Sequence, residues 1–320
     1  MDFSVNNSTD GFLMIKSAEK KTTAKGMPYL DIMFSDKTGE ISSKLWDYHE
    51  EVQGVFEAGD IVKVRGQISP YNGVDQLRIE KIRKALPSDN VDPSQFVPSA
   101  DIDGETMFNT LMQIAENLSD DEIKGVVVSI YTEYKDKLLY WPAAFRLHHA
   151  IRCGLLYHTL SIVRLAQAVC KIYPSVNENL LIGGAMLHDV AKIDEFEIND
   201  GGTVSGYSLE GNLVGHLAKG AIIIEKTAQK LGISNDTKLL LQHMVLSHHG
   251  EPEFGAAVKP MFLEAELLSQ LDLMDSRIYE LEEAIGNVSE GEYTNKMWAL
   301  DNRKFYNHGK NDVSTKAKII

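Results

Sequence analysis

The chain has 320 residues, of which 43% are hydrophobic and 24% charged, and its net charge is −14. These values are typical of a soluble globular protein with room for two domains, and the acidic charge argues against a protein that coats duplex DNA. The first twelve residues, MDFSVNNSTDGF, lack the basic and apolar regions of a signal peptide, and no apolar run reaches the length of a membrane span. The two cysteines, Cys153 and Cys170, lack the spacing of a metal site or a disulfide framework, which favours a cytoplasmic protein.

The first part of the chain alternates between apolar and polar residues with a period of two. This pattern and the intervening turn residues predict five strands, at residues 11–22, 28–36, 40–47, 60–68 and 74–85. The segment from Tyr48 to Ala58 is a short helix or a loop between the third and fourth strands. Five strands with a connector at this place fit a small all-β OB barrel, which we assign to residues 1–85.

OB barrels often bind single-stranded nucleic acid, with aromatic rings stacking on bases and basic groups contacting phosphates. The candidates for this role are Tyr29, Trp46, Arg65, Tyr71 and Arg78. A structural role is the alternative, in which Trp46 belongs to the core and Tyr71 is only a turn residue. For any one aromatic residue considered alone, the structural role is the more common one.

Residues 86–100 contain three prolines among Ser, Asp and Asn and are predicted to be a linker. Residues 101–306 show helical periodicity almost throughout, apart from a glycine-rich loop at 200–211, and residues 307–320 form a polar C-terminal tail. The predicted fold class is therefore multidomain, with a small all-β OB barrel followed by an all-α domain.

One predicted helix, Leu180 to Phe196, carries a His-Asp pair, His188 and Asp189, at its centre. Burying these polar groups in an apolar helix is costly unless something compensates them, and a divalent metal ion does so best. Lys192 lies three residues after Asp189, so it could hold an anionic substrate near the metal. An isolated His-Asp pair is more often structural, but the other histidines reverse that judgement.

Eight of the ten histidines lie between residues 142 and 250. Separate structural roles for so many histidines are improbable, and a shared metal site explains them more simply. The eight are His148, His149, His158, His188, His216, His243, His248 and His249. Asp189 and Asp272 supply the carboxylates and could bridge two ions.

The order His158, His188-Asp189 and Asp272 resembles the HD superfamily of metal-dependent phosphohydrolases, and His216 with His248-His249 resembles its two-metal branch. The resemblance extends along nearly the whole chain to YhaM-type 3′→5′ exoribonucleases, which join an OB domain to an HD domain. It is carried by GFLMIKSAEKKTTAKGMPYLDIMFSDKTGEISSKLWD, PAAFRLHHAIRCGLLYHTLSIV, MLHDVAKIDEF, LSHHGEPEFG and MWALDNRKFY, in this order. Two departures affect the expected substrate pocket: residues 151–153 replace a small glycine-containing turn, and Tyr157 replaces an acidic residue.

The resemblance implies two metal positions and a set of residues around them. One ion would be held by His158, His188, Asp189 and Asp272, and the second by Asp189, His216, His248 and His249. Histidine and carboxylate ligands suit Mn²⁺, Co²⁺ or Fe²⁺ better than Mg²⁺. Lys192 would stabilise charge on the phosphate, with Asp189 shared between the ions, and His149 and Arg146 could contact the phosphate.

Other polar residues of this region have roles that the sequence leaves open. His149 is as consistent with a supporting or core position as with a phosphate contact. His243 is more consistent with a structural role than a catalytic one. Asp275, three residues after Asp272, could support a ligand or cap the surface, and Glu195 and Glu251 could orient water or simply be solvated.

The sequence thus favours a cytoplasmic metal-dependent 3′→5′ exonuclease that hydrolyses single-stranded RNA, with single-stranded DNA as a second substrate, to nucleoside 5′-monophosphates. One alternative is an HD-type nucleotide phosphohydrolase or cyclic-nucleotide phosphodiesterase. Another is a non-catalytic nucleic-acid-binding protein whose HD domain senses metal. The strand-holding barrel argues against the first alternative and the full ligand set against the second. The sequence leaves open whether the chain forms a homo-oligomer.

Overall fold

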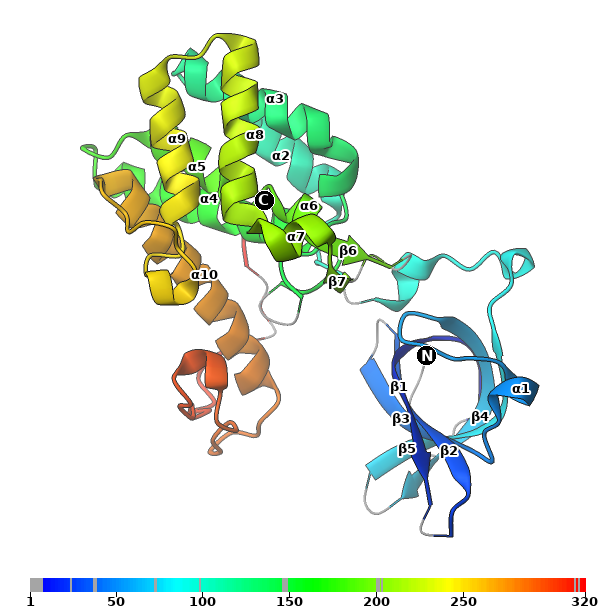
Figure 1. The fold of residues 1–320 in the computed structure, drawn as a ribbon. Helices are drawn as coiled ribbons and strands as arrows, with labels where there is room; N and C mark the ends of the chain where they lie inside the picture. The colour runs from blue at the N-terminus through cyan, green and yellow to red at the C-terminus, as the bar shows by residue number, and fades with distance from the viewer. Residues whose placement is uncertain are drawn as a thin grey trace. The chain divides into compact units, whose positions relative to one another are not determined.

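The computed structural model describes residues 8–320 except 24, 37–38, 72–73, 98, 146–148, 200–201, 203, 314 and 316 (Figure 1). The chain divides into two compact units. The barrel unit comprises Met1–Ser99 and Ile198–Ser205, and the helical unit comprises Ala100–Glu197 and Gly206–Ile320. Each unit has its own hydrophobic core.

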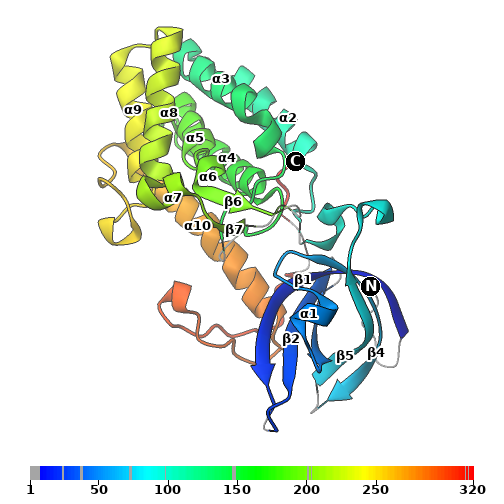
Figure 2. The same ribbon diagram turned by 45° about the vertical axis from the view of Figure 1, so that its right-hand side comes forward.

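The barrel unit contains five strands that close into a barrel in the order β1-β2-β3-β5-β4 (Figure 2). The strands are β1 (Ser8–Thr22), β2 (Pro28–Asp36), β3 (Gly39–Trp46), β4 (Ile61–Tyr71) and β5 (Val74–Lys84), with the short helix α1 (Glu50–Gln53) between β3 and β4. β3 and β5 pair in parallel, whereas the other neighbouring strands are antiparallel. This topology confirms the predicted OB barrel and its connector.

Alternation along the strands sends one set of side chains into the barrel. The interior is filled by aliphatic residues and one phenylalanine: Leu13, Ile15, Leu30, Ile32, Phe34, Ile41, Val62, Val64, Ile68 and Leu77. The register of β4 with β5 shifts between Arg65 and Gly66, where β5 has one extra residue. A Cβ at Gly66 would lie 2.3 Å from the Arg78 carbonyl oxygen, so only glycine allows the two strands to approach here.

The helical unit begins after two 3₁₀ turns, η1 (Pro87–Asp89) and η2 (Pro93–Phe96), which lie in the predicted linker. Its helices are α2 (Gly104–Glu116), α3 (Asp121–Leu138), α4 (Gly154–Ile172), α5 (Glu178–Leu187), α6 (Lys192–Glu195), α7 (Leu209–Leu213), α8 (Gly215–Leu231), α9 (Asn235–Ser247) and α10 (Leu263–Gly286), with 3₁₀ turns η3 (Pro252–Phe254) and η4 (Trp298–Leu300). Asp103, Asp120 and Ser234 cap α2, α3 and α9 with their side chains. Within the described residues, no helix combines the length and apolar character needed to span a membrane.

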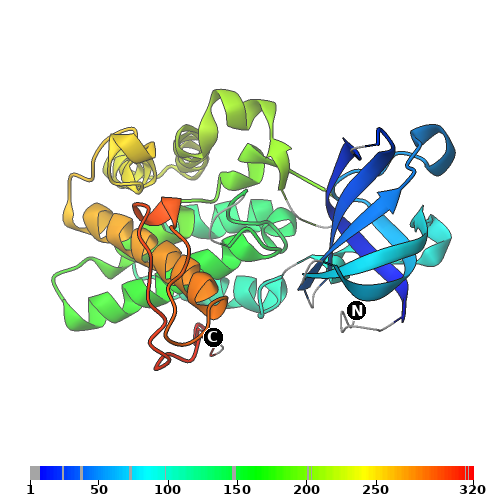
Figure 3. The same ribbon diagram turned by 90° about the horizontal axis from the view of Figure 1, so that it is seen from below.

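Helix α5 lies at the centre of this unit. Every side chain from Leu180 to Leu187 is buried. The helix packs against α3, α4, α9 and α10, and Figure 3 shows α10 running alongside α4. A helix that is apolar on all sides requires such a position, so the sequence explains why α5 is the core element.

The prediction of one continuous helix from Leu180 to Phe196 is wrong. Helix α5 ends at Leu187, residues 188–191 form tight turns, and α6 is a separate short helix. In these turns the Lys192 N–H donates to the Asp189 carbonyl oxygen, 3.0 Å away. Helical periodicity cannot reveal this break, because successive i→i+3 bonds keep nearly the same spacing of apolar residues.

The region after α6 is also more structured than the predicted glycine-rich loop. Strand β6 (Phe196–Ile198) pairs with β7 (Val204–Tyr207) in a two-stranded sheet. The short helix α7 then begins after Ser208, whose hydroxyl accepts a hydrogen bond from the Gly211 N–H. Strands this short carry too few alternating residues to be recognised in sequence.

Candidate metal centre

The His-Asp pair lies directly after the end of α5. The Nδ1 of His188 donates to the Ala185 carbonyl oxygen, 2.7 Å away. The lone pair of the neutral ring is therefore on Nε2, which lies 3.3 Å from Oδ2 of Asp189. The end of α5 thus fixes both the orientation and the tautomer of His188.

His158 approaches the same point from the middle of α4. Its Nε2 lies 3.4 Å from Nε2 of His188, 3.7 Å from Oδ2 of Asp189 and 3.1 Å from Oδ1 of Asp272. Asp272 comes from α10, so α4, α5 and α10 each contribute to this group. The His158 side chain has no exposed surface, and burial lowers its pKa, but the hydrogen bonds that its ring donates to Asp272 and Asp275 outweigh burial and raise the pKa to about 10 in the metal-free chain.

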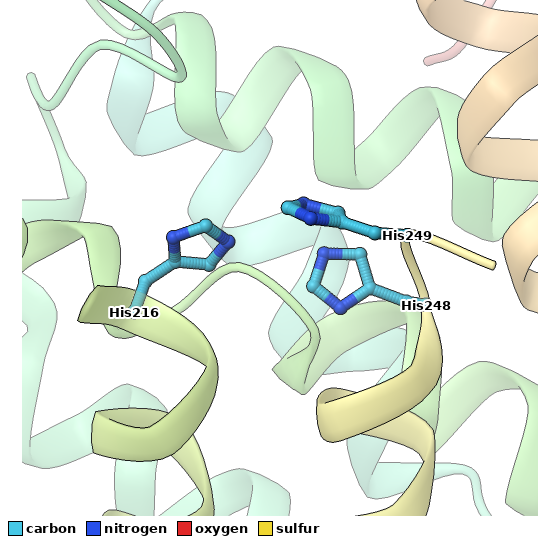
Figure 4. A group of neighbouring side chains, drawn as sticks. All are labelled: His216, His248 and His249. Carbon is cyan, nitrogen blue, oxygen red and sulfur yellow. The ribbon is translucent and has the colours of Figure 1, made fainter. Parts of the chain in front are cut away.

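A second group of histidines faces the other side of Asp189. His216 lies in the first turn of α8, and His248 and His249 follow α9; their imidazoles converge in Figure 4. The Nε2 atoms of His216 and His248 each lie 3.5 Å from Oδ1 of Asp189. The Nδ1–H of His248 donates to the Val245 carbonyl oxygen, 2.8 Å away. The lone pair of the neutral His248 ring is then on Nε2, which faces the Asp189 carboxylate.

Asp189 therefore presents a different oxygen to each group. Oδ2 faces His158 and His188, and Oδ1 faces His216 and His248. Burial would raise the pKa of this carboxyl, but Lys192 and His188 outweigh it and hold the pKa well below its usual value. A buried, ionised carboxylate with one oxygen toward each histidine group is suited to bridge two cations.

Several buried polar atoms at this centre have no hydrogen-bond partner in the described part of the chain. They are Oδ1 of Asp189, Nε2 of His216, Nε2 of His248 and Nδ1 of His249. Leaving such atoms unpaired costs free energy, and divalent transition metals bind these atom types. Burial lowers the pKa of His249 to about 3, so its ring is neutral, as a metal ligand requires. The donor set fits divalent metal ions.

Lys192 supplies the positive charge closest to Asp189. Its Nζ donates to Oδ2 of Asp189 over 2.6 Å, and the side chain is almost fully buried. Burial lowers the pKa of the amine, but Asp189 outweighs this effect and raises it overall. Lys192 is therefore protonated, and its ammonium lies beside the Asp189 oxygen that faces His158 and His188.

The other predicted residues lie in different settings. His149 is buried, with Nε2 2.9 Å from Oδ2 of Asp275. The Nε2 of His243 accepts a hydrogen bond from the Met261 N–H, 3.0 Å away, which gives it a structural role. Glu251 forms an ion pair with Lys259. Arg146 and His148 lie outside the described residues.

The barrel unit brings two of its predicted nucleic-acid residues together. Tyr29 and Trp46 are cross-strand partners on β2 and β3, and their ring centroids lie 4.9 Å apart. Trp46 is 55% exposed, so its structural alternative as a core residue is wrong. The Nζ of Lys44 lies 5.5 Å from the Tyr29 ring centroid and 5.6 Å from that of Trp46. We call Tyr29, Trp46 and Lys44 the aromatic platform.

The remaining predicted residues of the barrel differ in accessibility. Arg65 is paired through its guanidinium with Asp10, so its charge is already partly neutralised. Arg78 is exposed on β5. Ser42 pairs with Gln76, so Lys44 and Arg78 are each two residues further along and on the same face. Tyr71 ends β4, and its side chain lies outside the described residues.

Sequence reasoning missed Lys44 and left Asp275 and Glu195 undecided. Lys44 could have been found, because it stands two residues before Trp46 in the same strand and thus on the same face. Asp275 follows Asp272 by one helical turn, and its Oδ2 lies 2.8 Å from Nδ1 of His158. Oε1 of Glu195 lies 2.9 Å from Nδ1 of His216, a contact that depends on the break after α5.

Comparison with known proteins agrees with this geometry. The family model described as HD domain matches residues 155–277, a range that contains every residue of the two histidine groups. The chain is 38% identical over 307 residues to a protein named 3′-5′ exoribonuclease YhaM from Listeria welshimeri, covering 96% of this chain and 97% of the relative. The chain belongs to the YhaM family.

A second YhaM-family relative, from Listeria monocytogenes serotype 4b, is 37% identical over the same shares of both chains. Both relatives are matched over the barrel unit as well as the HD domain. Among solved structures, a domain of replication protein A from Methanococcus maripaludis covers 25% of this chain and 86% of its own, with 23% identity and a TM-score of 0.22.

Proposed function

We propose that this chain is a 3′→5′ exoribonuclease that uses two divalent transition-metal ions, with Mn²⁺ preferred, to degrade single-stranded RNA to nucleoside 5′-monophosphates. The observation that carries this proposal is the position of Asp189, with one carboxylate oxygen toward each of two histidine groups. Both curated relatives described above are named 3′-5′ exoribonucleases and match nearly the whole chain.

These distances support two ligand sets. The first position would be held by His158, His188, Asp189 and Asp272, and the second by Asp189, His216, His248 and His249. Imidazole and carboxylate ligands together favour Mn²⁺, Co²⁺ or Fe²⁺ over Mg²⁺. Such ions would supply Lewis-acid activation of the scissile phosphate and of the attacking water.

The chain's own residues prepare the site for this chemistry. Asp189 and Asp272 stay ionised because neighbouring cationic and imidazole groups hold their pKa values low. Lys192 is protonated and buried beside Asp189, where its ammonium would stabilise negative charge developing on the phosphate. His149 donates toward Asp275, so we assign it a supporting role rather than a phosphate contact.

The barrel unit would hold the RNA strand away from its 3′ end. The aromatic platform offers two ring faces and one ammonium on an accessible strand face, with Arg78 as a further cation. Stacking does not distinguish ribose from deoxyribose, so single-stranded DNA should bind as well. We place the enzyme in the cytoplasm, in keeping with two free cysteines.

The test is hydrolysis of an oligoribonucleotide labelled at its 5′ or 3′ end, with Mn²⁺. A 3′→5′ exonuclease should convert the 5′-labelled strand into a ladder of shortening products and release the 3′ label at once as a mononucleotide. Asp189→Asn, which keeps the side-chain shape but removes the bridging charge, should abolish both signals. Cleavage of free nucleotides with no action on the strand would instead indicate a nucleotide phosphohydrolase, and binding without cleavage would indicate a non-catalytic protein.

A further inference from the structure

Two carboxylates contact the outer ring nitrogens of two proposed metal ligands. Oδ2 of Asp275 lies 2.8 Å from Nδ1 of His158. Oε1 of Glu195 lies 2.9 Å from Nδ1 of His216 and also accepts the His216 backbone N–H at 3.2 Å. In both cases the contacted nitrogen is the one that faces away from Asp189.

These contacts decide which ring nitrogen carries the lone pair. A carboxylate can only accept, so His158 and His216 each donate their Nδ1–H, and Nε2 is the nitrogen that would release its proton and offer a lone pair to a metal ion. Nε2 of His158 then points at Asp272, and Nε2 of His216 points at Asp189. The other two central histidines, His188 and His248, are oriented by backbone carbonyls instead. Each histidine group thus has one ring anchored by a carboxylate and one by the backbone.

Asp275 is itself held in place. The same Oδ2 atom accepts from Nε2 of His149, 2.9 Å away, and His149 packs on Tyr279 with 4.2 Å between ring centroids. Asp275 has 12% side-chain exposure and His149 has 2%. Glu195 is similarly buried, with 10% exposure. Buried carboxylates with fixed partners can impose an orientation that exposed ones cannot.

We propose that Asp275 and Glu195 are positioning residues, one for each metal position of the exoribonuclease proposed above. Asp275 orients His158 and increases its basicity at the first position, and Glu195 does the same for His216 at the second. Removing such a carboxylate costs about 10- to 100-fold in metal affinity in comparable sites. The proposal rests on the proposed function, because it assumes that both histidine groups bind metal.

The experiment is an Mn²⁺ titration of the metal-free full-length protein in competition with a chelating dye. Asp275→Ala and Glu195→Ala should each weaken one binding event by about 10- to 100-fold, whereas Asp275→Asn and Glu195→Gln should lose less, because the amide oxygen can still accept. Asp136→Asn, an exposed aspartate on α3, is the matched control and should bind like the parent. Saturating Mn²⁺ should restore the turnover of each variant, which a folding defect would prevent.

A double-mutant cycle then identifies the position that each carboxylate serves. In a His158→Ala background, Asp275→Asn should weaken Mn²⁺ binding no further, and the same should hold for Glu195→Gln in His216→Ala. If the parent binds two ions and the variants bind them equally well, this inference is overturned and the proposed function stands. If the parent binds no divalent ion, both are overturned.

Discussion

The Lys192 ammonium lies 2.6 Å from Oδ2 of Asp189, the same oxygen that faces His158 and His188. The lysine therefore compensates this carboxylate on one side, because Oδ1 faces the imidazoles of His216 and His248 among the described residues. Lys192 and a metal ion would compensate the same charge, so we expect the lysine to contribute both to the stability of the metal-free fold and to catalysis.

We expect Lys192→Met to destabilise the metal-free protein more than the Mn²⁺-loaded one. Removing one member of a buried ion pair costs about 3–5 kcal/mol, and bound cations would offset part of that loss. Thermal unfolding with and without Mn²⁺ measures the difference. At saturating Mn²⁺, turnover should still fall about 100-fold, as when a donor to a developing oxyanion is removed. Equal destabilisation in both states would contradict the shared role.

Asp189→Asn and Asp272→Asn should differ in how many ions they release. Asp189 faces both histidine groups, so its substitution should weaken both Mn²⁺ binding events. Asp272 also lies near His248, but its shortest contact is the 3.1 Å to His158 in the first group, so Asp272→Asn should weaken the first binding event much more than the second. Counting bound Mn²⁺ after dialysis decides this, and two ions retained by Asp189→Asn would rule out the bridge.

The two metal positions should also differ in preference. In the proposed ligand sets the first position would have two carboxylates and two imidazoles, whereas the second would have three imidazoles and one carboxylate, Asp189. Carboxylates suit Mn²⁺, and imidazole-rich sites favour Co²⁺ or Zn²⁺. We therefore expect Mn²⁺ to fill the first position at lower concentration, and Co²⁺ to displace it first from the second. His249→Ala should remove only the weaker of the two Mn²⁺-binding events. Loss of the tighter event would show that the second position, not the first, binds Mn²⁺ more tightly.

The sequence was sufficient to predict the barrel because strand alternation directly records which side chains point inward. Val62 and Val64 are buried in β4 whereas Arg65 is exposed, and this alternation was readable in the residue types. The metal ligands could be proposed from residue type and from family resemblance together.

The contacts that orient the proposed metal ligands could not be predicted from the sequence, because they depend on local backbone geometry. The break after Leu187 turns Asp189 between two histidine groups and brings Glu195 against His216, while periodicity favoured an unbroken helix. The anchoring of His188 uses a backbone carbonyl, which leaves no trace in sequence. Asp275 had an equally plausible surface role until its contact with His158 was observed.

The aromatic platform gives a prediction for RNA binding. Trp46→Ala should weaken binding of a single-stranded oligoribonucleotide by about 1–3 kcal/mol, the usual contribution of one stacked base. Stability should change little, because the ring is 55% exposed. Trp298→Ala, at a 72% exposed tryptophan of the helical unit, is the matched control. Fluorescence anisotropy at fixed salt measures RNA binding by both variants. Equal effects of the two substitutions would show that the aromatic platform does not contact the RNA.

Arg65 should contribute less to binding than Arg78. Its guanidinium is paired with Asp10, whose pKa is lowered mainly by that hydrogen bond, so contacting a phosphate would require breaking the pair. Arg78→Ala should therefore reduce the salt dependence of RNA binding, whereas Arg65→Ala should change it less. Binding measured across a series of salt concentrations distinguishes them, and a larger change for Arg65 would show that its pair with Asp10 opens on RNA.

Glu122 on α3 gives a prediction for acid stability. Its carboxylate accepts from the backbone N–H and hydroxyl of Ser234 and from the Thr237 hydroxyl, and so joins α3 to the start of α9. These hydrogen bonds, chiefly that of the Ser234 hydroxyl, lower its pKa from 4.5. A lowered pKa contributes stability above the unfolded value, and this contribution is lost as the pH falls through the folded value. Glu122→Gln should therefore lose less stability than the parent on acidification below about pH 5.

Urea unfolding at a series of pH values measures this loss of stability, with Glu116→Gln at an exposed glutamate of α2 as the control. Parallel acid profiles for Glu122→Gln and the parent would show that the carboxylate does not couple the two helices.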